Sequence, residues 1–241
     1  MHVVSVQTSD ERGGGEYANV DLLDKLAGAG HRVKLVTNFP ELADGTSVPV
    51  RHVDLGPKLS KRGLKQVATR FPLYAGRFVR ALRAEAAEAP IDVVLLHYKK
   101  EQLMSRLVTP GISPRVVWAE WGPVPFEFRT GLPQRAYAFS AGRAAHVACV
   151  SEGTRQTVVA AGVPEARASV VPNLVEVADH DFDPEARVRY RAEWGVDAHA
   201  PRGELVGEEE RRRAPVVGPH HPNSASCQDR SVASGSKRFS A

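Results

Sequence analysis

Short, uninterrupted apolar runs are the feature that most constrains the fold of this chain. They are rich in Val, Leu and Ile, and most are continuous rather than alternating with polar residues. Continuous runs of this length are typical of parallel strands that are covered on both faces. None approaches the roughly 20 apolar residues that span a bilayer. The predicted strands are residues 2–6, 33–37, 48–53, 91–97, 115–119, 146–150 and 168–171.

Helical patterns separate several of these strands. Residues 16–29 place their apolar side chains on one stripe that glycines terminate. Residues 64–89 form a long helical pattern, which we expect to break or kink at Pro72. Ser151 is a suitable N-cap for a helix over residues 154–161. Strands that alternate with helices predict an α/β fold, a Rossmann-like parallel sheet flanked by helices.

The end of the chain has a different composition. From residue 198 onward, charge clusters, prolines and serines replace the periodic apolar pattern. Such a composition buries too little apolar surface to offset the conformational entropy lost on folding. We therefore expect residues 1–197 to form the folded domain and residues 198–241 to be a disordered tail.

Composition narrows the class of protein. Of the 241 residues, 42% are hydrophobic and 25% are charged, which is typical of globular domains. The apolar start of the chain is too short for a signal peptide. Two cysteines cannot form a disulfide framework, so we expect a reducing, cytoplasmic setting. The net charge of +4 is compatible with anionic partners, and nothing in it requires nucleic acid.

The loop after the first strand is the first candidate site, because ligands of an open parallel sheet bind at the carboxyl ends of its strands. It contains Gly13, Gly14, Gly15 and Glu16. Glycines let the backbone approach a ligand, and free amides at a helix start attract phosphate or sugar hydroxyls. The alternative is a flexible turn between strand and helix. The glycines do not follow the G-x-G-x-x-G pattern, and Asn38 rather than an acidic residue follows the second strand, which disfavours a nicotinamide dehydrogenase.

Three further loops carry polar or aromatic side chains at the same edge. His97 ends a strand, where it could bind a sugar hydroxyl or instead be a capping or core histidine. Glu120 and Trp121 combine a carboxylate with an indole, which suits a sugar-binding face, although Trp121 could equally pack under its loop. Ser151 fits a helix start as well as a ligand contact. We find no P-loop or nucleophile elbow, and we expect no metal site.

A basic segment lies between the third and fourth predicted strands. No acidic residue occurs from residue 58 to residue 83, and the cations there interleave with apolar side chains. Such a segment can dock on anionic lipid or receive an anionic acceptor, or it can be a core helix with a cationic outer face. The candidate membrane or acceptor patch is Arg70, Arg77, Arg80 and Arg83. If this patch binds lipid, the protein would lie peripherally at the inner face of the membrane.

Several of these segments occur together in one order along the chain. They are Gly13-Gly14-Gly15-Glu16, the strand ending in His97, Glu120-Trp121-Gly122-Pro123, Val150-Ser151-Glu152 and Val170-Val171-Pro172-Asn173-Leu174-Val175. In this order they resemble glycosyltransferase family 4 over about residues 1–197. The resemblance implies one half of a GT-B fold, in which two Rossmann-like domains face each other across a cleft. This chain would supply the N-terminal, acceptor-side half. Within these segments, Ser151 and Asn173 are further candidate substrate-binding residues.

The resemblance also implies a reaction. Family members transfer a sugar from a nucleotide-sugar to an acceptor with retention of anomeric configuration, and we expect a hexosyl group and a sugar or lipid-linked acceptor. By matching position, Gly13 to Gly15 would lie against the donor diphosphate or the acceptor, and His97 would reach toward the transferring sugar. Glu120 stands where the family often has histidine. The nucleotide-sugar is then a substrate, and we expect no bound cofactor.

The donor side of the reaction has no counterpart in this sequence. In the family a second domain holds the donor with basic residues and two glutamates spaced eight apart, and residues 198–241 lack that pattern. We therefore expect a truncated or frameshifted product that is inactive alone, because lost stabilisation of the leaving group costs orders of magnitude in rate. The alternative is a non-catalytic module that binds a sugar or lipid acceptor. An unrelated Rossmann-like nucleotide enzyme is less favoured.

Overall fold

The computed structural model describes residues 1–9, 13–44, 46–59, 63–173 and 183–195. The chain divides into two compact units, Met1–Val175 and Glu176–Ala241, each of which is described by itself. The predicted tail, residues 198–241, and its predicted boundary lie outside the described residues.

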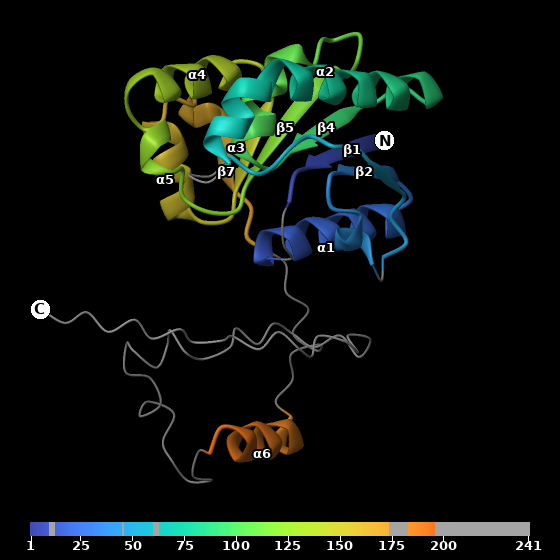
Figure 1. Cartoon of the computed structure of the whole chain (residues 1–241), viewed down its shortest axis with the longest axis vertical. Helices are drawn as coiled ribbons and strands as arrows, with labels where there is room; N and C mark the ends of the chain where they lie inside the picture. Colours follow the sequence, from blue (N-terminus) through green and yellow to red (C-terminus); the bar gives the residue numbers. More distant parts are fainter. Residues whose placement is uncertain (10–12, 45, 60–62, 174–182, 196–241) are drawn as a thin grey trace, which may run out of the picture. The chain divides into compact units, whose positions relative to one another are not determined.

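One parallel sheet organises the described part of the first unit (Figure 1). Its seven strands have the order β3-β2-β1-β4-β5-β6-β7. The strand β1 lies in the interior, where Val6 is in register with Val36 on one side and with Leu96 on the other. All the predicted strands are confirmed, although β3 and β4 are shorter than expected. The strands are β1 (His2–Gln7), β2 (Arg32–Thr37), β3 (Val50–His52), β4 (Val93–Leu96), β5 (Arg115–Glu120), β6 (His146–Cys149) and β7 (Ala168–Val170).

Helices cover the two faces of the sheet unequally. From β1 the chain steps outward to β2 and β3, and it then returns to β4 and steps outward in the opposite direction. Because crossovers between parallel strands are right-handed, this reversal places the first helix on one face and the later helices on the other. Figure 1 shows α1 on one face and the later helices on the other. The helices of this unit are α1 (Gly14–Gly28), α2 (Leu64–Glu88), α3 (Lys99–Leu103), α4 (Gly131–Ala141) and α5 (Glu152–Ala160).

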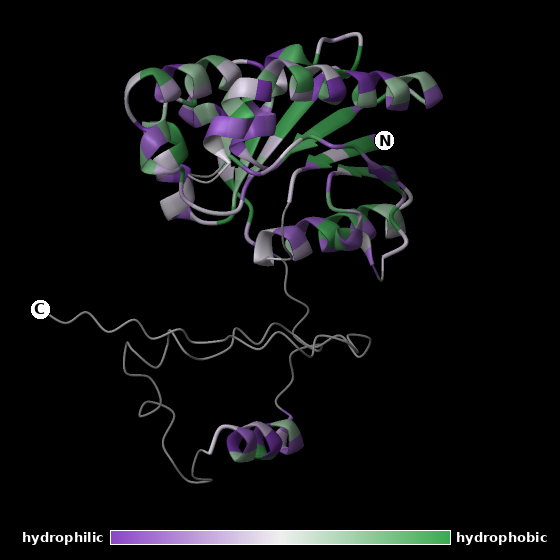
Figure 2. Cartoon of the chain, in the orientation of Figure 1, coloured by the Kyte–Doolittle hydropathy of each residue, from purple (hydrophilic) through white to green (hydrophobic). Residues whose placement is uncertain are grey.

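Alternate side chains of the strands build two hydrophobic cores, because successive side chains of a strand point to opposite faces. In β1, Val4 and Val6 belong to the larger core beneath α2, α4 and α5. Val3 belongs to the smaller core, where it packs with Leu23 of α1. Figure 2 shows the hydrophobic strands between helices that also present hydrophilic residues.

The helix α2 differs from the prediction at Pro72. It continues from Leu64 to Glu88 with Pro72 inside it, so the expected break is absent. Proline cannot donate the usual backbone hydrogen bond within a helix. Tyr74, Phe78 and Leu82 bury one side of α2 in the larger core, and this apolar burial offsets the lost bond.

In the second unit, the helix α6 (Pro184–Glu193) is capped by Asp183, whose side chain accepts hydrogen bonds from the amides of Glu185 and Ala186. Asp183 is therefore the N-cap of α6. No helix in the described ranges is both long enough and apolar enough to cross a membrane.

The loop between β3 and α2 depends on Gly56. This residue has a φ of +74°, and a Cβ atom there would collide with the ring of Tyr74. We expect Gly56→Ala to lower the free energy of unfolding by about 2–4 kcal/mol, from left-handed strain plus overpacking. Urea denaturation measures the change.

Gly30→Ala is the matched control for this prediction. Gly30 has a φ of +82°, and a Cβ atom there would meet nothing within 4 Å. The free energy of unfolding of Gly30→Ala should fall by about 1–2 kcal/mol, from backbone strain alone. Equal losses in the two variants would show that Tyr74 does not restrict position 56.

Candidate functional site

The candidate site lies at the carboxyl edge of the sheet, where the strand order reverses between β1 and β4. His97 and Tyr98 directly follow β4, and Trp121 directly follows β5. The glycine loop leads from β1 into α1 at the same edge. Such a reversal point is the usual ligand site of an open parallel sheet.

His97 is held at this edge by two hydrogen bonds. The indole Nε1 of Trp121 donates to His97 Nδ1 over 2.9 Å, and the two ring planes differ by 3°. Because Nδ1 accepts this bond, the ring proton lies on Nε2, which is 2.8 Å from Ser5 Oγ and donates to it. The imidazole is 2% exposed. Both ring nitrogens of His97 are therefore engaged inside the protein.

The hydrogen-bond chain continues through α1. Ser5 Oγ donates to Asn19 Oδ1 over 3.2 Å, and Asn19 Nδ2 donates to Gln7 Oε1 over 2.6 Å. Burial lowers the pKa of His97 to about 3, although the nearby carboxylate of Glu16 opposes this shift. The imidazole is consequently neutral near pH 7, where it can orient Trp121 but carries no positive charge.

Glu16 is the charged member of the glycine loop. Ser9 Oγ donates to its Oε1 over 3.0 Å and Lys58 Nζ over 2.7 Å, and the Tyr98 hydroxyl also donates to this atom. Burial alone would raise the pKa of Glu16, but the hydrogen bonds from Lys58 and Tyr98 hold it below its usual value. Glu16 is therefore an ionised carboxylate in the first turn of α1, where the helix dipole also favours an anion.

The three predicted glycines differ in what a side chain at each position would contact. A Cβ atom on Gly15 would lie 3.0 Å from Trp121 Cγ, so the indole packs against this position. A Cβ atom on Gly13 would lie 2.8 Å from Glu16 Oε2. Gly14 is exposed, and a Cβ atom there would meet nothing within 4 Å. Gly14 is thus the glycine of this loop whose Cβ position is open space.

Glu120 points to the helix-rich face of the sheet. Lys99 Nζ lies 2.6 Å from its Oε1, and the Tyr137 hydroxyl donates to the same atom over 2.7 Å. Burial, followed by the charge of Glu120, raises the pKa of Tyr137, so its hydroxyl remains a donor. The carboxylate is 3% exposed and bound to these partners, whereas Trp121 turns toward His97 and Gly15.

The remaining predicted site residues lie farther along the edge. Ser151 is exposed, and its Oγ accepts a hydrogen bond from the Thr154 amide over 3.2 Å, which confirms the predicted N-cap of α5. Asn173 is exposed and lines a cavity of about 200 Å³ together with Glu120 and Trp121. The other walls of this cavity are mainly apolar and come from α1 and from β4, β5 and β6.

The short helix α3 contributes charged residues that were not predicted. Lys100 is 1% exposed, and its ammonium donates to the carbonyls of Leu55, Gly56 and Pro57 over 2.8, 3.0 and 2.7 Å. Its neighbour Glu101 is fully buried, and burial raises the pKa of this carboxyl. The sequence contained a signal for Lys100 and Glu101, a run of charged residues directly after a buried strand. Charged residues in this position lie at the ligand-binding edge of the sheet.

The predicted membrane patch is divided by the structure. Arg70, Arg80 and Arg83 are exposed on α2. Arg77 instead pairs with the carboxylate of Asp54, and its Nη1 also donates to the Asp54 carbonyl over 3.0 Å. Arg77 therefore anchors the loop after β3.

A metal-binding cluster does not occur in the part of the chain that the structure describes. No group of three or more His, Cys, Asp or Glu side chains there is placed to hold a metal ion. The candidate site is thus built from hydrogen-bonding groups and two paired lysines, Lys58 and Lys99.

The buried neutral state of His97 predicts a pH dependence of stability. The unfolded imidazole titrates near its ordinary value of 6.5, and the folded one near 3. The unfolded state therefore binds more protons between these values, and stability falls as the pH is lowered. The contribution of His97 to this slope is about 1.4 kcal/mol per pH unit between pH 6 and 4. Urea titrations should show a shallower slope for His97→Gln, and equal slopes would contradict the buried neutral state.

Comparison with known proteins gives one family match. The sequence profile described as Glycosyltransferase Family 4 matches residues 12–179. No curated protein matches the sequence significantly.

The fold is similar to several solved structures. HepE from Anabaena, in complex with UDP-glucose, has a TM-score of 0.62 at 16% identity, covering 81% of this chain and 50% of that chain. Sucrose-phosphate synthase from Thermosynechococcus elongatus has a TM-score of 0.58 at 14% identity, covering 83% and 54%. A glycosyltransferase from Rickettsia africae has a TM-score of 0.53 at 13% identity, covering 83% and 51%. At these identities the likeness shows the fold, and this chain spans about half the length of each neighbour.

These findings confirm the resemblance and the half of the GT-B fold that it implied. The family profile covers more than half of the chain, and it includes the glycine loop, His97, Trp121 and Asn173. The chain belongs to Glycosyltransferase Family 4.

Proposed function

We propose that residues 1–175 are the acceptor-side half of a retaining glycosyltransferase that uses a nucleotide-sugar donor. The transferred group is a hexosyl unit, and the acceptor is a sugar or a lipid-linked sugar. The observation that carries this proposal is the Trp121–His97 pair at the reversal point of a family 4 fold, where the indole lies against Gly15 and the preceding Gly14 is exposed. The similar fold of HepE in complex with UDP-glucose supports a nucleotide-sugar as donor.

The charge of the glycine loop supports an acceptor at this position. Glu16 is ionised and lies in the first turn of α1. This buried carboxylate engages the ammonium of Lys58, so the cation beside the loop is compensated and does not favour a diphosphate over the hydroxyl groups of a sugar. The partly buried indole of Trp121 lines the cavity near Asn173 and offers an apolar surface for a sugar ring.

Donor activation is assigned to a second half of the enzyme. The leaving diphosphate develops charge, and preorganised donors must stabilise it for rapid transfer. In the described residues at this edge, Lys58 is bound to Glu16, Lys99 is bound to Glu120, and His97 is neutral. We therefore expect residues 1–175 to bind without turnover unless a donor-binding half accompanies them.

A non-catalytic acceptor-binding module is the second candidate. The observation that favours it is the internal use of the polar groups: both nitrogens of His97 and the carboxylate of Glu120 have protein partners. Such groups can shape a binding surface without taking part in transfer.

A binding and turnover experiment on the full chain tests the sugar-binding site that both functions share. On a glycan array we expect binding of at least one sugar, and with UDP-glucose added we expect no transfer product. Binding of a nicotinamide dinucleotide at this edge in place of sugars would overturn both sugar-binding functions. Sequencing the gene beyond codon 195 in all three frames then decides between them. A frame that encodes a glycine-rich Rossmann half with two glutamates eight apart supports the enzyme, and its absence supports the module.

The position of Gly14 gives a sharper test of the site. We expect Gly14→Ala to weaken binding of the sugar found on the array by about tenfold, because a methyl group there enters the ligand's space, a loss of about 1.4 kcal/mol. Surface plasmon resonance measures the affinity.

Gly28→Ala is the matched control, since it lies in the same helix and its Cβ atom also meets nothing within 4 Å. Both variants should keep the melting temperature of the wild type or raise it slightly. If both variants bind the sugar with wild-type affinity, Gly14 does not border the ligand.

A further inference from the structure

The outward side of α4 carries an exposed apolar stripe. Leu132, Arg135, Ala136 and Phe139 follow the spacing that places residues on one side of a helix, and all are exposed. Leu132 is 77% exposed and Phe139 65%. The opposite side of α4 already faces the core through Tyr137. The stripe is therefore additional to the side of α4 that packs against the fold.

The 3₁₀ helix η2 (Met104–Leu107) continues this surface toward α2. The guanidinium of Arg106 lies 4.3 Å from the ring centroid of Phe139, and its Nε donates to the Phe139 carbonyl over 2.8 Å. The next residue, Leu107, is 39% exposed. Because η2 contacts both α2 and α4, the exposed side chains of the three elements form one surface.

A groove of about 450 Å³ lies between α2 and η2. Its apolar lining comes from Ala75, Gly76, Val79 and Leu107, and its cationic lining comes from Arg80 and Arg83. These two arginines are exposed and make no ion pair with any residue that the structure describes. The groove thus combines an apolar floor with two cations available at its rim.

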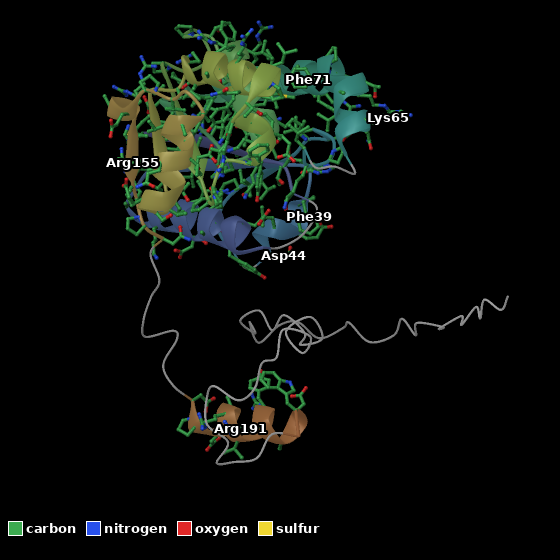
Figure 3. The ribbon with its side chains drawn as sticks, turned by 90° about the vertical axis from the view of Figure 1, so that its left-hand side faces the viewer. Phe39, Asp44, Lys65, Phe71, Arg155 and Arg191 are labelled. Carbon is green, nitrogen blue, oxygen red and sulfur yellow. The ribbon has the colours of Figure 1, made fainter. Side chains whose placement is uncertain are left out.

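The charge of this surface has one sign. The helix α2 has no acidic residue before Glu85, and η2 and α4 have none. Glu85 is buried and Glu88 is half-exposed, and both pair with Arg51. Lys65 points outward near the start of α2 (Figure 3) and adds to the positive charge.

We propose that this surface, the α2–α4 face formed by Arg80, Arg83, Leu107, Leu132 and Phe139, docks on a bilayer containing anionic phospholipid. Arginines bind the headgroup phosphates, and the leucine and phenylalanine side chains enter the boundary of the acyl chains. Exposed apolar groups interleaved with unpaired cations favour lipid over a purely anionic polymer, which offers no apolar phase. The proposal is independent of sugar transfer, since the face lies on the outer side of the helices rather than at the carboxyl edge.

The experiment uses the full chain and vesicles of phosphatidylcholine with or without phosphatidylglycerol. In co-sedimentation, the wild type should bind the vesicles that contain phosphatidylglycerol, and added salt should weaken this binding. Arg80→Gln with Arg83→Gln should weaken it about 25-fold, or about fivefold per cation removed. Leu132→Gln with Phe139→Gln should weaken it about tenfold without changing the net charge. Both changes are on exposed side chains, and thermal melting checks that the variants fold.

Lys25→Gln with Arg155→Gln is the matched control, because it removes the same charge from α1 and α5. This variant should bind the vesicles as the wild type does. Loss of binding equal to that of the Arg80 and Arg83 variant would show only a response to net charge and would overturn the docking face. The proposal would also be overturned if the Leu132 and Phe139 variant bound the vesicles as the wild type does and both proteins bound heparin equally. That result would identify a general polyanion surface. If the wild type did not bind the vesicles, the proposed docking face would also be overturned.

Discussion

The buried ammonium of Lys100 is the interaction on which the carboxyl edge of this fold depends. A charge removed from water is costly unless hydrogen bonds and opposite charge surround it, and here three backbone carbonyls and Glu101 do so. The carbonyls belong to the loop after β3, which also contains Lys58. Lys100 thereby places Lys58 beside Glu16, and Glu16 sets the charge of the glycine loop.

The neutral hydrogen-bond chain from Trp121 to Gln7 has a different role. Trp121, His97, Ser5 and Asn19 each donate to the next member of the chain, so the direction of the bonds specifies the tautomer of His97. The buried imidazole holds the indole against Gly15, where a Cβ atom would be a tight contact. His97, neutral and bound on both nitrogens, therefore fixes the position of the aromatic ring at this edge.

Particular elements show how far sequence reasoning reached. The strands were predictable because fully covered parallel strands are apolar without interruption, and Ser151 was predictable because its side chain caps its own helix. Of the predicted break or kink at Pro72, the break does not occur, because the burial of Tyr74 and Phe78 against residues distant in sequence outweighs a local preference. The role of Arg77 on α2 was missed in the same way, because its partner Asp54 lies in the loop after β3.

By itself, the sequence determined the α/β class, the sheet edge that carries the candidate site and the family, since these depend on local patterns and on motifs in a characteristic order. Only the tertiary structure decided which polar groups remain available. Glu120 ends β5 and Trp121 follows it, yet Glu120 binds Lys99 and Tyr137 of the later helices whereas Trp121 binds His97, and these partners are distant in sequence. Likewise, Lys100 became a structural residue because distant carbonyls surround it, a contact that depends on long-range folding rather than on local sequence.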